Sequence, residues 1–170
     1  MQALGFQGWC LAASGHPAQG IPLLTAGLER QRAIGSTLYV PHGLTMLADA
    51  YRIGGAPEAG LAQISQAERL AEATHVKWVL AETRRLRGDL LAQTGDRMAT
   101  EASYRDGIAL AQRQDGKLFE LRASVSLAQL WRDRGKSTEA RDLLAPVYAW
   151  FTEGFYMPDL VAAKALLDEL

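Results

Sequence analysis

The sequence predicts an all-α protein, a solenoid of four antiparallel helix pairs closed by one terminal helix. Two observations carry this prediction. Residues of similar size recur every 40 positions, and glycine holds one of the recurring positions in all four copies. A fixed period of this order is typical of stacked repeats. We therefore expect a right-handed superhelix that forms a single domain over residues 1–170, with repeats over about 1–36, 37–75, 76–116 and 117–153.

Five positions recur in each repeat: a small residue, a large one, glycine, a second small residue and a second large one. In that order they are Gly8, Ala48, Gly88 and Ala128; Leu11, Tyr51, Leu91 and Trp131; Gly15, Gly55, Gly95 and Gly135; Gly20, Gly60, Thr100 and Ala140; and Leu24, Ile64, Tyr104 and Leu144. The glycine position suits a helix end, where a left-handed residue without Cβ carries no penalty. Small residues let two helices approach closely, and large residues fill the space between them.

These positions place the helices. We expect helices that end at Ser14 and Ile53, and others over Pro17–Ile34, Pro57–Ala73, Val76–Thr94, Arg97–Gln114, Leu118–Arg134, Ser137–Phe151 and Pro158–Glu169. Proline opens several of them, as suits a first turn, whereas Pro22 and Pro146 fall inside helices and are expected to kink them. Asp96 is the expected N-cap of the sixth helix.

The last helix, 158–169, is interpreted as the cap that covers the final apolar face of the array. Its inward residues would be Leu160, Ala163, Leu166 and Leu167. The preceding segment, Tyr148–Tyr156, is the most aromatic part of the chain. We expect it to pack between the fourth repeat and the cap, and the alternative is an exposed aromatic docking patch.

Composition excludes several classes of function. The chain has 18 Lys and Arg against 19 Asp and Glu, for a net charge of −1, so nothing favours nucleic acid as a partner. No apolar run is long enough to span a membrane, and no secretory signal is visible. The one cysteine, Cys10, fits a reducing, cytoplasmic location and is expected to be buried. Because a helix follows Met1 almost at once, we expect the chain to be the C-terminal part of a longer protein, and the alternative is a genuine short protein.

The first helix of each pair is expected to line the concave face of the superhelix. Helical spacing places these candidate partner-binding residues there: Trp9, His42, Asp49, Arg52, Glu82, Arg85, Asp89, Arg122, Gln129 and Arg132. The same spacing also places Ala12 and Thr45 on the exposed side. The arginines could bind carboxylates of a partner through paired hydrogen bonds. The alternative is a solvated surface on which these charges pair with one another.

No enzyme motif is present. Gly54, Gly55 and Gly60 lack the lysine and hydroxyl residue of a phosphate-binding loop. The three histidines, His16, His42 and His75, are far apart in the sequence and have no paired cysteines, so no metal is expected. We expect neither catalytic residues nor a cofactor in this chain.

The recurring positions resemble the tetratricopeptide repeat (TPR), although the usual period is about 34 residues and the frequent proline at the end of that repeat is absent. Residues 121–170 and 86–96 are also similar to the C-terminal TPR region of large bacterial signalling proteins. Those proteins carry a nucleotide cyclase or winged-helix domain and an ATPase domain. The resemblance implies a regulatory role and transfers no catalytic residue to this chain.

The favoured function is therefore a non-catalytic scaffold that binds a protein or peptide, including the cyclase or ATPase domains of the same polypeptide. One alternative is a small effector that enters the groove near Trp9, Asp49 and Arg52. Another is a homodimer formed through the first helix and the aromatic tail, with Trp150 and Phe155 in the interface.

Overall fold

The computed structural model describes residues 2–170, and of Gln2 only the backbone. Within this range the chain is all-α. The helices are α1 (Gln2–Ala13), α2 (Pro17–Ala33), α3 (Val40–Ile53), α4 (Pro57–Thr74), α5 (Leu80–Thr94), α6 (Arg97–Arg113), α7 (Lys117–Arg132), α8 (Ser137–Ala149) and α9 (Pro158–Glu169). The predicted fold class is confirmed.

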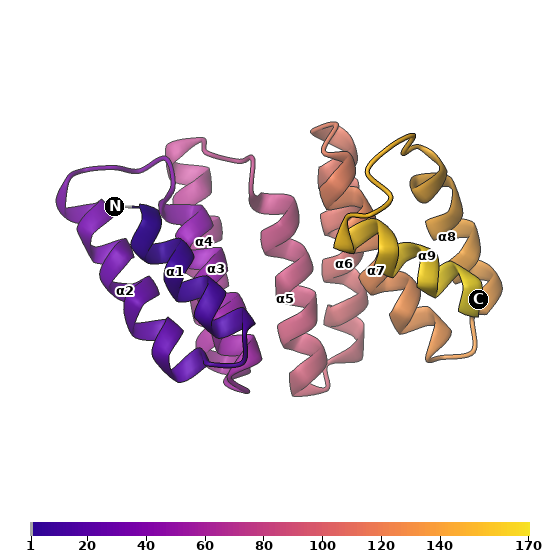
Figure 1. Ribbon diagram of the computed structural model, residues 1–170, viewed down its shortest axis with the longest axis horizontal. Helices are drawn as coiled ribbons and strands as arrows, with labels where there is room; N and C mark the ends of the chain where they lie inside the picture. The colour runs from indigo at the N-terminus through magenta and orange to yellow at the C-terminus, as the bar shows by residue number, and fades with distance from the viewer. Residues whose placement is uncertain (1) are drawn as a thin grey trace.

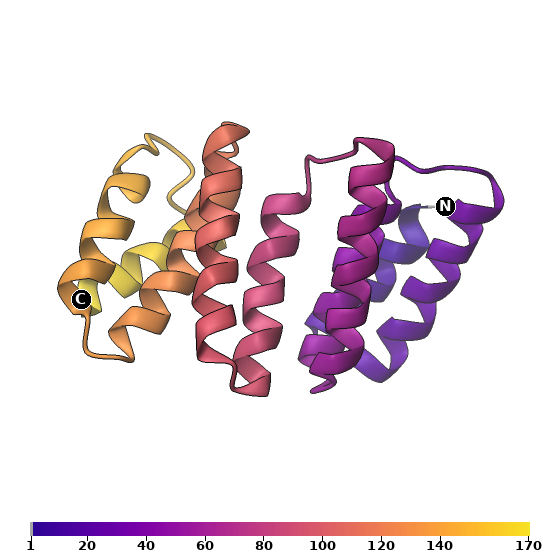
Figure 2. The same ribbon diagram turned by 180° about the vertical axis from the view of Figure 1, so that it is seen from behind.

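The helices stack as pairs along the long axis of the molecule. Each helix packs against the next one in the chain, and α1, α3, α5, α7 and α9 also contact one another in succession. In Figure 1, α1 and α9 lie on the side of the molecule that faces the viewer. The even-numbered helices form the opposite side, which faces the viewer in Figure 2. The odd-numbered helices therefore form one continuous surface across all the repeats.

Most helix ends fall within two residues of their predicted positions, and α9 matches at both ends. The start of α5 was predicted wrongly, at Val76 instead of Leu80. His75 ends α4 in the left-handed conformation, with φ of 58°, and residues 76–79 then form a connection before the next helix. An amide of Leu80 bonded to the carbonyl of Lys77 closes that turn.

The recurring positions behave as the sequence predicts. The first, fourth and fifth positions of every repeat are buried, and the second is half-buried. Gly15, Gly55, Gly95 and Gly135 all have positive φ, between 70° and 87°. Backbone approaches backbone most closely between α1 and α2, where a Cβ on Gly20 would lie 2.3 Å from the carbonyl oxygen of Gly8. Small residues are needed there because backbone meets backbone.

The terminal helix covers the end of the array. Leu160, Ala163, Leu166 and Leu167 are buried in one apolar cluster with residues of α7 and α8, as predicted. On the opposite surface of α9, Lys164 forms an ion pair with Asp168. A polar outer face of this kind is what a capping element of a solenoid requires. The Asp96 cap is also confirmed, since its side chain accepts a hydrogen bond from the Ala99 amide.

Cys10 is exposed, contrary to the prediction. The equivalent residues one and two repeats on, Ala50 and Leu90, are 0% exposed because the preceding helix pair covers them. The first pair has no such neighbour within the described residues, so the same position on α1 faces outward. The prediction that Ala12 and Thr45 lie on the exposed surface is also wrong, since close packing between helices buries both residues.

Part of the aromatic segment before α9 packs against the core, as expected, and part is exposed, as in the alternative. Tyr148 and Phe151 pack against the cluster formed by α7, α8 and α9. Trp150, Phe155 and Tyr156 are exposed, and Tyr156 is 88% exposed. Phe155 and Trp150 contact the rings of Tyr148 and Phe151 but stay about half exposed, so packing accounts for only part of the segment. Among residues 2–170, no helix is both long and apolar enough to cross a membrane.

Candidate functional site: a groove on the odd-numbered helices

The surface of the odd-numbered helices contains two adjoining hollows, which share Trp9, Asp49, Glu82 and Arg122. The first, here called the aromatic pocket, has a volume of about 210 Å³ and is lined by Phe6, Trp9, His42, Thr45, Met46, Asp49, Trp78, Val79, Glu82, Leu86, Phe119 and Arg122. The second, here called the charged hollow, has a volume of about 350 Å³ and is lined by Trp9, Asp49, Arg52, Glu82, Arg85, Arg122, Val125, Ser126, Gln129, Asp159 and Ala162.

Rings from different repeats form the aromatic pocket. The centroids of Phe6 and His42 are 6.1 Å apart, and those of His42 and Trp78 are 5.1 Å apart, both pairs in tilted arrangements. These distances are in the range in which aromatic pairs attract one another. Phe6 is 48% exposed and Trp78 is 42% exposed. The pocket therefore presents aromatic surface to solvent at the junction of the first three repeats.

His42 lies in the middle of this row of rings. Burial lowers the pKa of its imidazole below the ordinary value of 6.5, although the charge of Glu82 acts in the opposite direction. Burial penalises the charged form of an imidazole. His42 is therefore neutral at neutral pH, and it serves as an aromatic wall of the pocket rather than as a charge.

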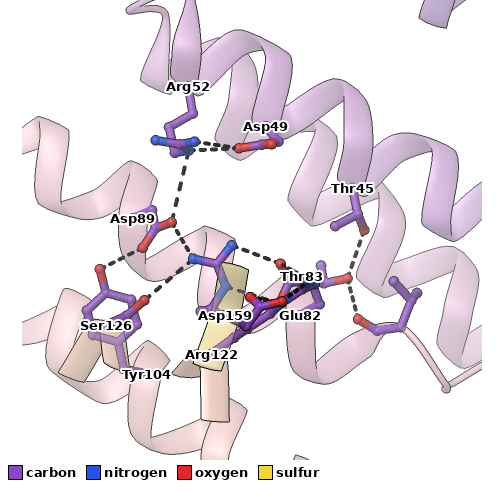
Figure 3. A network of polar contacts seen from close by, with 12 residues as sticks. Thr45, Asp49, Arg52, Glu82, Thr83, Asp89, Tyr104, Arg122, Ser126 and Asp159 are labelled. Atoms are coloured by element: carbon purple, nitrogen blue, oxygen red, sulfur yellow. Dashed lines mark hydrogen bonds and ion pairs between the residues drawn. The ribbon is translucent and has the colours of Figure 1, made fainter. Parts of the chain in front are cut away.

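Three arginines and four carboxylates form a network in the charged hollow and beside it (Figure 3). Arg52 bonds Asp49 at 2.8 Å and lies 4.0 Å from Asp89. Arg85 bonds both oxygens of Glu82 and, at 2.7 Å, Asp89. Burial opposes the charge of Arg85, but the two carboxylates raise the pKa of its guanidinium above the usual value. Arg85 is held as a permanent cation, and each of its three nitrogens donates a hydrogen bond within the chain.

The third arginine ties the fourth repeat to the cap. Arg122 donates two hydrogen bonds to Asp159 of α9, at 2.8 and 3.0 Å, and its remaining nitrogen lies 3.9 Å from Glu82. Behind Arg85, the hydroxyl of Tyr104 donates to Asp89 at 2.8 Å. Burial and this carboxylate together raise the pKa of Tyr104. The network thus crosses from α3 to α9 and joins the odd-numbered helices to one another.

The structure brings most of the predicted site residues together. Seven of them line the charged hollow: Trp9, Asp49, Arg52, Glu82, Arg85, Arg122 and Gln129. His42 lines the aromatic pocket, and Asp89 bonds Arg85 and Tyr104. Arg132 lies apart from both hollows, where it pairs with Asp133 and Glu169.

Sequence reasoning missed Phe6, Trp78, Phe119 and Asp159 as groove residues. Arg122 and Ala162 lie 40 positions apart, so extending the repeat period from the predicted Arg122 into the last helix would have placed the first turns of that helix, including Asp159, beside the groove. Trp78 stands in the connection before α5, and helical periodicity carries no information about a residue in a loop.

The arrangement is suited to binding. Among the described residues, no group of three or more His, Cys, Asp or Glu could hold a metal ion. The arginines and carboxylates of the network pair with one another. These contacts are those of the alternative in which Asp49, Glu82 and Asp89 pair with neighbouring arginines. The surface left for a ligand is the aromatic pocket and its carboxylate edge.

No protein-family model matches the chain, and no curated protein matches its sequence. Among solved structures, the chain is similar to a Podospora anserina kinesin-light-chain-type protein with nearly identical TPR-like repeats, at a TM-score of 0.71 and 16% identity, covering 99% of this chain and 83% of that one. The fold is TPR-like. A second crystal structure, of a point variant of the same fungal protein, gives the same values. At this identity the TPR-like resemblance concerns the fold alone.

Proposed function

We propose that this TPR-like domain is a non-catalytic interaction scaffold that binds a protein or peptide segment in the groove on its odd-numbered helices. The observation that carries the proposal is the aromatic pocket. Phe6 and Trp78 remain about half exposed there, and together with Trp9, His42 and Phe119 they line a single hollow. Exposed aromatic residues gathered in a concave site are typical of binding surfaces, because rigid rings bury much area at low entropic cost.

The charged network supports the same proposal in a different way. Its ion pairs join α3, α5, α7 and α9, so the groove keeps one shape before a partner arrives. A preformed site spends less binding free energy on ordering its own side chains. Under this proposal the network is the frame of the groove, and the aromatic pocket makes the anchoring contact.

A peptide-display selection tests the proposal. Peptides enriched on the unmodified chain should lose binding to a Trp78→Glu variant, since a carboxylate would replace an aromatic wall of the pocket. The matched control is Trp150→Glu, because Trp150 is also exposed but lies at the far end of the array. Thermal unfolding verifies that both variants fold. Enriched peptides that bind all three proteins equally would exclude the aromatic pocket as the binding site.

The similarity of residues 121–170 and 86–96 to the tails of bacterial signalling proteins supports a more specific version. In that version the partner is the ATPase or cyclase domain of such a protein, and binding regulates nucleotide turnover. Purified ATPase or cyclase domain from a protein of that group would be mixed with this chain, with turnover and co-sedimentation as readouts. If neither changes at micromolar concentrations, the signalling version fails and the general scaffold function is unaffected.

A further inference from the structure

We propose that the aromatic pocket accepts a monovalent organic cation, the guanidinium or ammonium head of an arginine or lysine side chain in the bound partner. This inference rests on the proposed function and adds the chemical class of the anchor. It depends on three properties of the lining: the rings, the balance of charge, and the free acceptor capacity of two carboxylates.

The rings come first. Phe6, Trp9, Trp78 and Phe119 line one hollow together with His42. The face of an aromatic ring attracts a cation within about 6 Å of its centroid, most strongly for tryptophan. A volume of about 210 Å³ accommodates one side chain. Aromatic rings contributed by several helices can therefore surround a single head group, and recognition of alkylated ammonium ions commonly uses such a cage.

The charges around the pocket favour the same ligand. Two carboxylates, Asp49 and Glu82, and one guanidinium, Arg122, line it. Arg52 and Arg85 are bonded to these carboxylates, but the whole network, with Asp89 and Asp159 included, has three guanidinium groups and four carboxylates and so keeps a net charge of −1. His42 adds no compensating charge at neutral pH because burial keeps it uncharged. A single positive charge on the ligand brings the filled pocket to neutrality.

The two carboxylates also have acceptor sites to offer. Oδ1 of Asp49 lies 2.8 Å from two nitrogens of Arg52, whereas Oδ2 accepts a single hydrogen bond, from Trp9. Each oxygen of Glu82 accepts one hydrogen bond from Arg85. An ionised carboxylate has about four lone-pair sites, so both groups can accept further N–H donors. A guanidinium or ammonium supplies donors for them.

A neutral anchor fits this lining less well. An aliphatic or aromatic side chain would remove water from Asp49 and Glu82 without providing donors, and the loss of hydration by a charged group is costly unless it is paired. An anionic anchor would meet the same carboxylates. It would also find Arg122 already engaged, since two of the nitrogens of Arg122 bond Asp159 and the third faces Glu82.

The test compares N-acetyl-arginine amide with N-acetyl-citrulline amide, its uncharged analogue of nearly the same shape. Binding is followed by NMR through the four indole N–H signals of the intact chain, each assigned by a single Trp→Phe variant. We expect the arginine probe to shift the signals of Trp9 and Trp78 saturably in the millimolar range, and the signal of Trp150 to stay fixed. We expect the citrulline probe to bind at least tenfold more weakly.

Two variants test the roles of the rings and the carboxylates. Trp78→Ala and Asp49→Asn should each weaken binding of the arginine probe about fivefold or more. The control for the charge change is Asp106→Asn, which removes a carboxylate from the surface of α6, where it pairs with Arg84. Unchanged affinity in both pocket variants would overturn the assignment.

The outcomes separate this inference from the proposed function. Equal binding of the two probes would show that the positive charge is not recognised and overturn the cation inference, while the groove would remain a binding site. The cation inference would also be overturned if about 50 mM arginine probe shifted no indole signal, because a complex with a Kd near 1 mM would be saturated at that concentration. Peptides selected by display would still report independently on the groove.

Discussion

The indole nitrogen of Trp9 donates a hydrogen bond to Oδ2 of Asp49 at 3.0 Å, and the two residues lie 40 positions apart. The bond therefore joins equivalent sites on the first helices of adjacent repeats. A contact between neighbours is the unit from which solenoid stability is built, because each repeat touches only the next one.

Replacement of Trp9 by phenylalanine keeps an aromatic ring but removes this donor. We expect the free energy of unfolding to fall by about 1 kcal/mol, the usual net contribution of such a hydrogen bond. Urea unfolding followed by circular dichroism measures the change. Trp150→Phe is the control, since Trp150 is exposed, and a loss of equal size in that variant would contradict the assignment to the bond.

Gly20→Ala tests the close approach of α1 and α2. The added methyl would lie 2.3 Å from the Gly8 carbonyl oxygen and 2.9 Å from the amide of Ala12. Because both are backbone atoms, the helices must separate, and we expect a loss of about 2 kcal/mol or more. Gly5→Ala is the matched control on α1, where no atom lies within 4 Å of the added methyl. Alanine has a higher helix propensity than glycine, so this control variant should be more stable than the unmodified chain by up to about 1 kcal/mol. The melting temperatures of the two variants should therefore shift in opposite directions.

Arg85→Met leaves Glu82 and Asp89 facing each other without their shared cation. The three side chains are between 15% and 18% exposed, so solvent screens the remaining charges only in part. We expect a loss of at least about 2 kcal/mol in the free energy of unfolding. Arg113→Met, at the exposed end of α6, serves as the control. Charge reversal of Arg85 would be more damaging still, so it cannot serve to test partner binding at constant stability.

Stability should fall as the pH drops below about 6.5, through His42. Its pKa in the folded chain is lowered from 6.5 by burial. The unfolded chain therefore binds a proton at a higher pH than the folded chain does, and the free energy of unfolding decreases as pH falls through this window. Chemical denaturation at about pH 7.5 and about pH 5.5, on either side of the ordinary histidine pKa, measures the change for the unmodified chain and for His42→Gln.

The difference between the two pH values should be smaller in His42→Gln than in the unmodified chain. His16→Gln provides the control, since His16 is exposed at the start of α2. If all three proteins lose the same stability at the lower pH, the imidazole of His42 is not the source.

The period of the sequence predicted the fold closely because it reports on contacts between neighbours. Gly8 and Gly20, or Ala128 and Ala140, recur wherever two helices must approach, so their spacing fixes both helices of a pair. The loops were harder to predict. Residues 76–79 contain no glycine or proline that would mark a loop, but the left-handed His75 redirects the chain, and α5 starts later than periodicity suggests.

The candidate site was predicted in part for a related reason. Helical spacing placed Asp49, Arg52, Glu82, Arg85 and Arg122 on one surface, and the structure gathers them there. Helical spacing does not predict which partner each arginine has. Arg122, for example, bonds Asp159 of another helix, 37 positions away. Nor could helical spacing place Trp78, whose loop carries no periodic signal.

The helix pairs, the positions that they bury and the surface formed by the first helices all follow from the amino-acid sequence, since they depend on local geometry repeated every 40 residues. Which charges are paired, and which rings meet in a pocket, follows instead from the folded chain. These contacts depend on the rotation between successive helix pairs. That rotation sets the distances between side chains of different repeats, and the period of the sequence does not encode it.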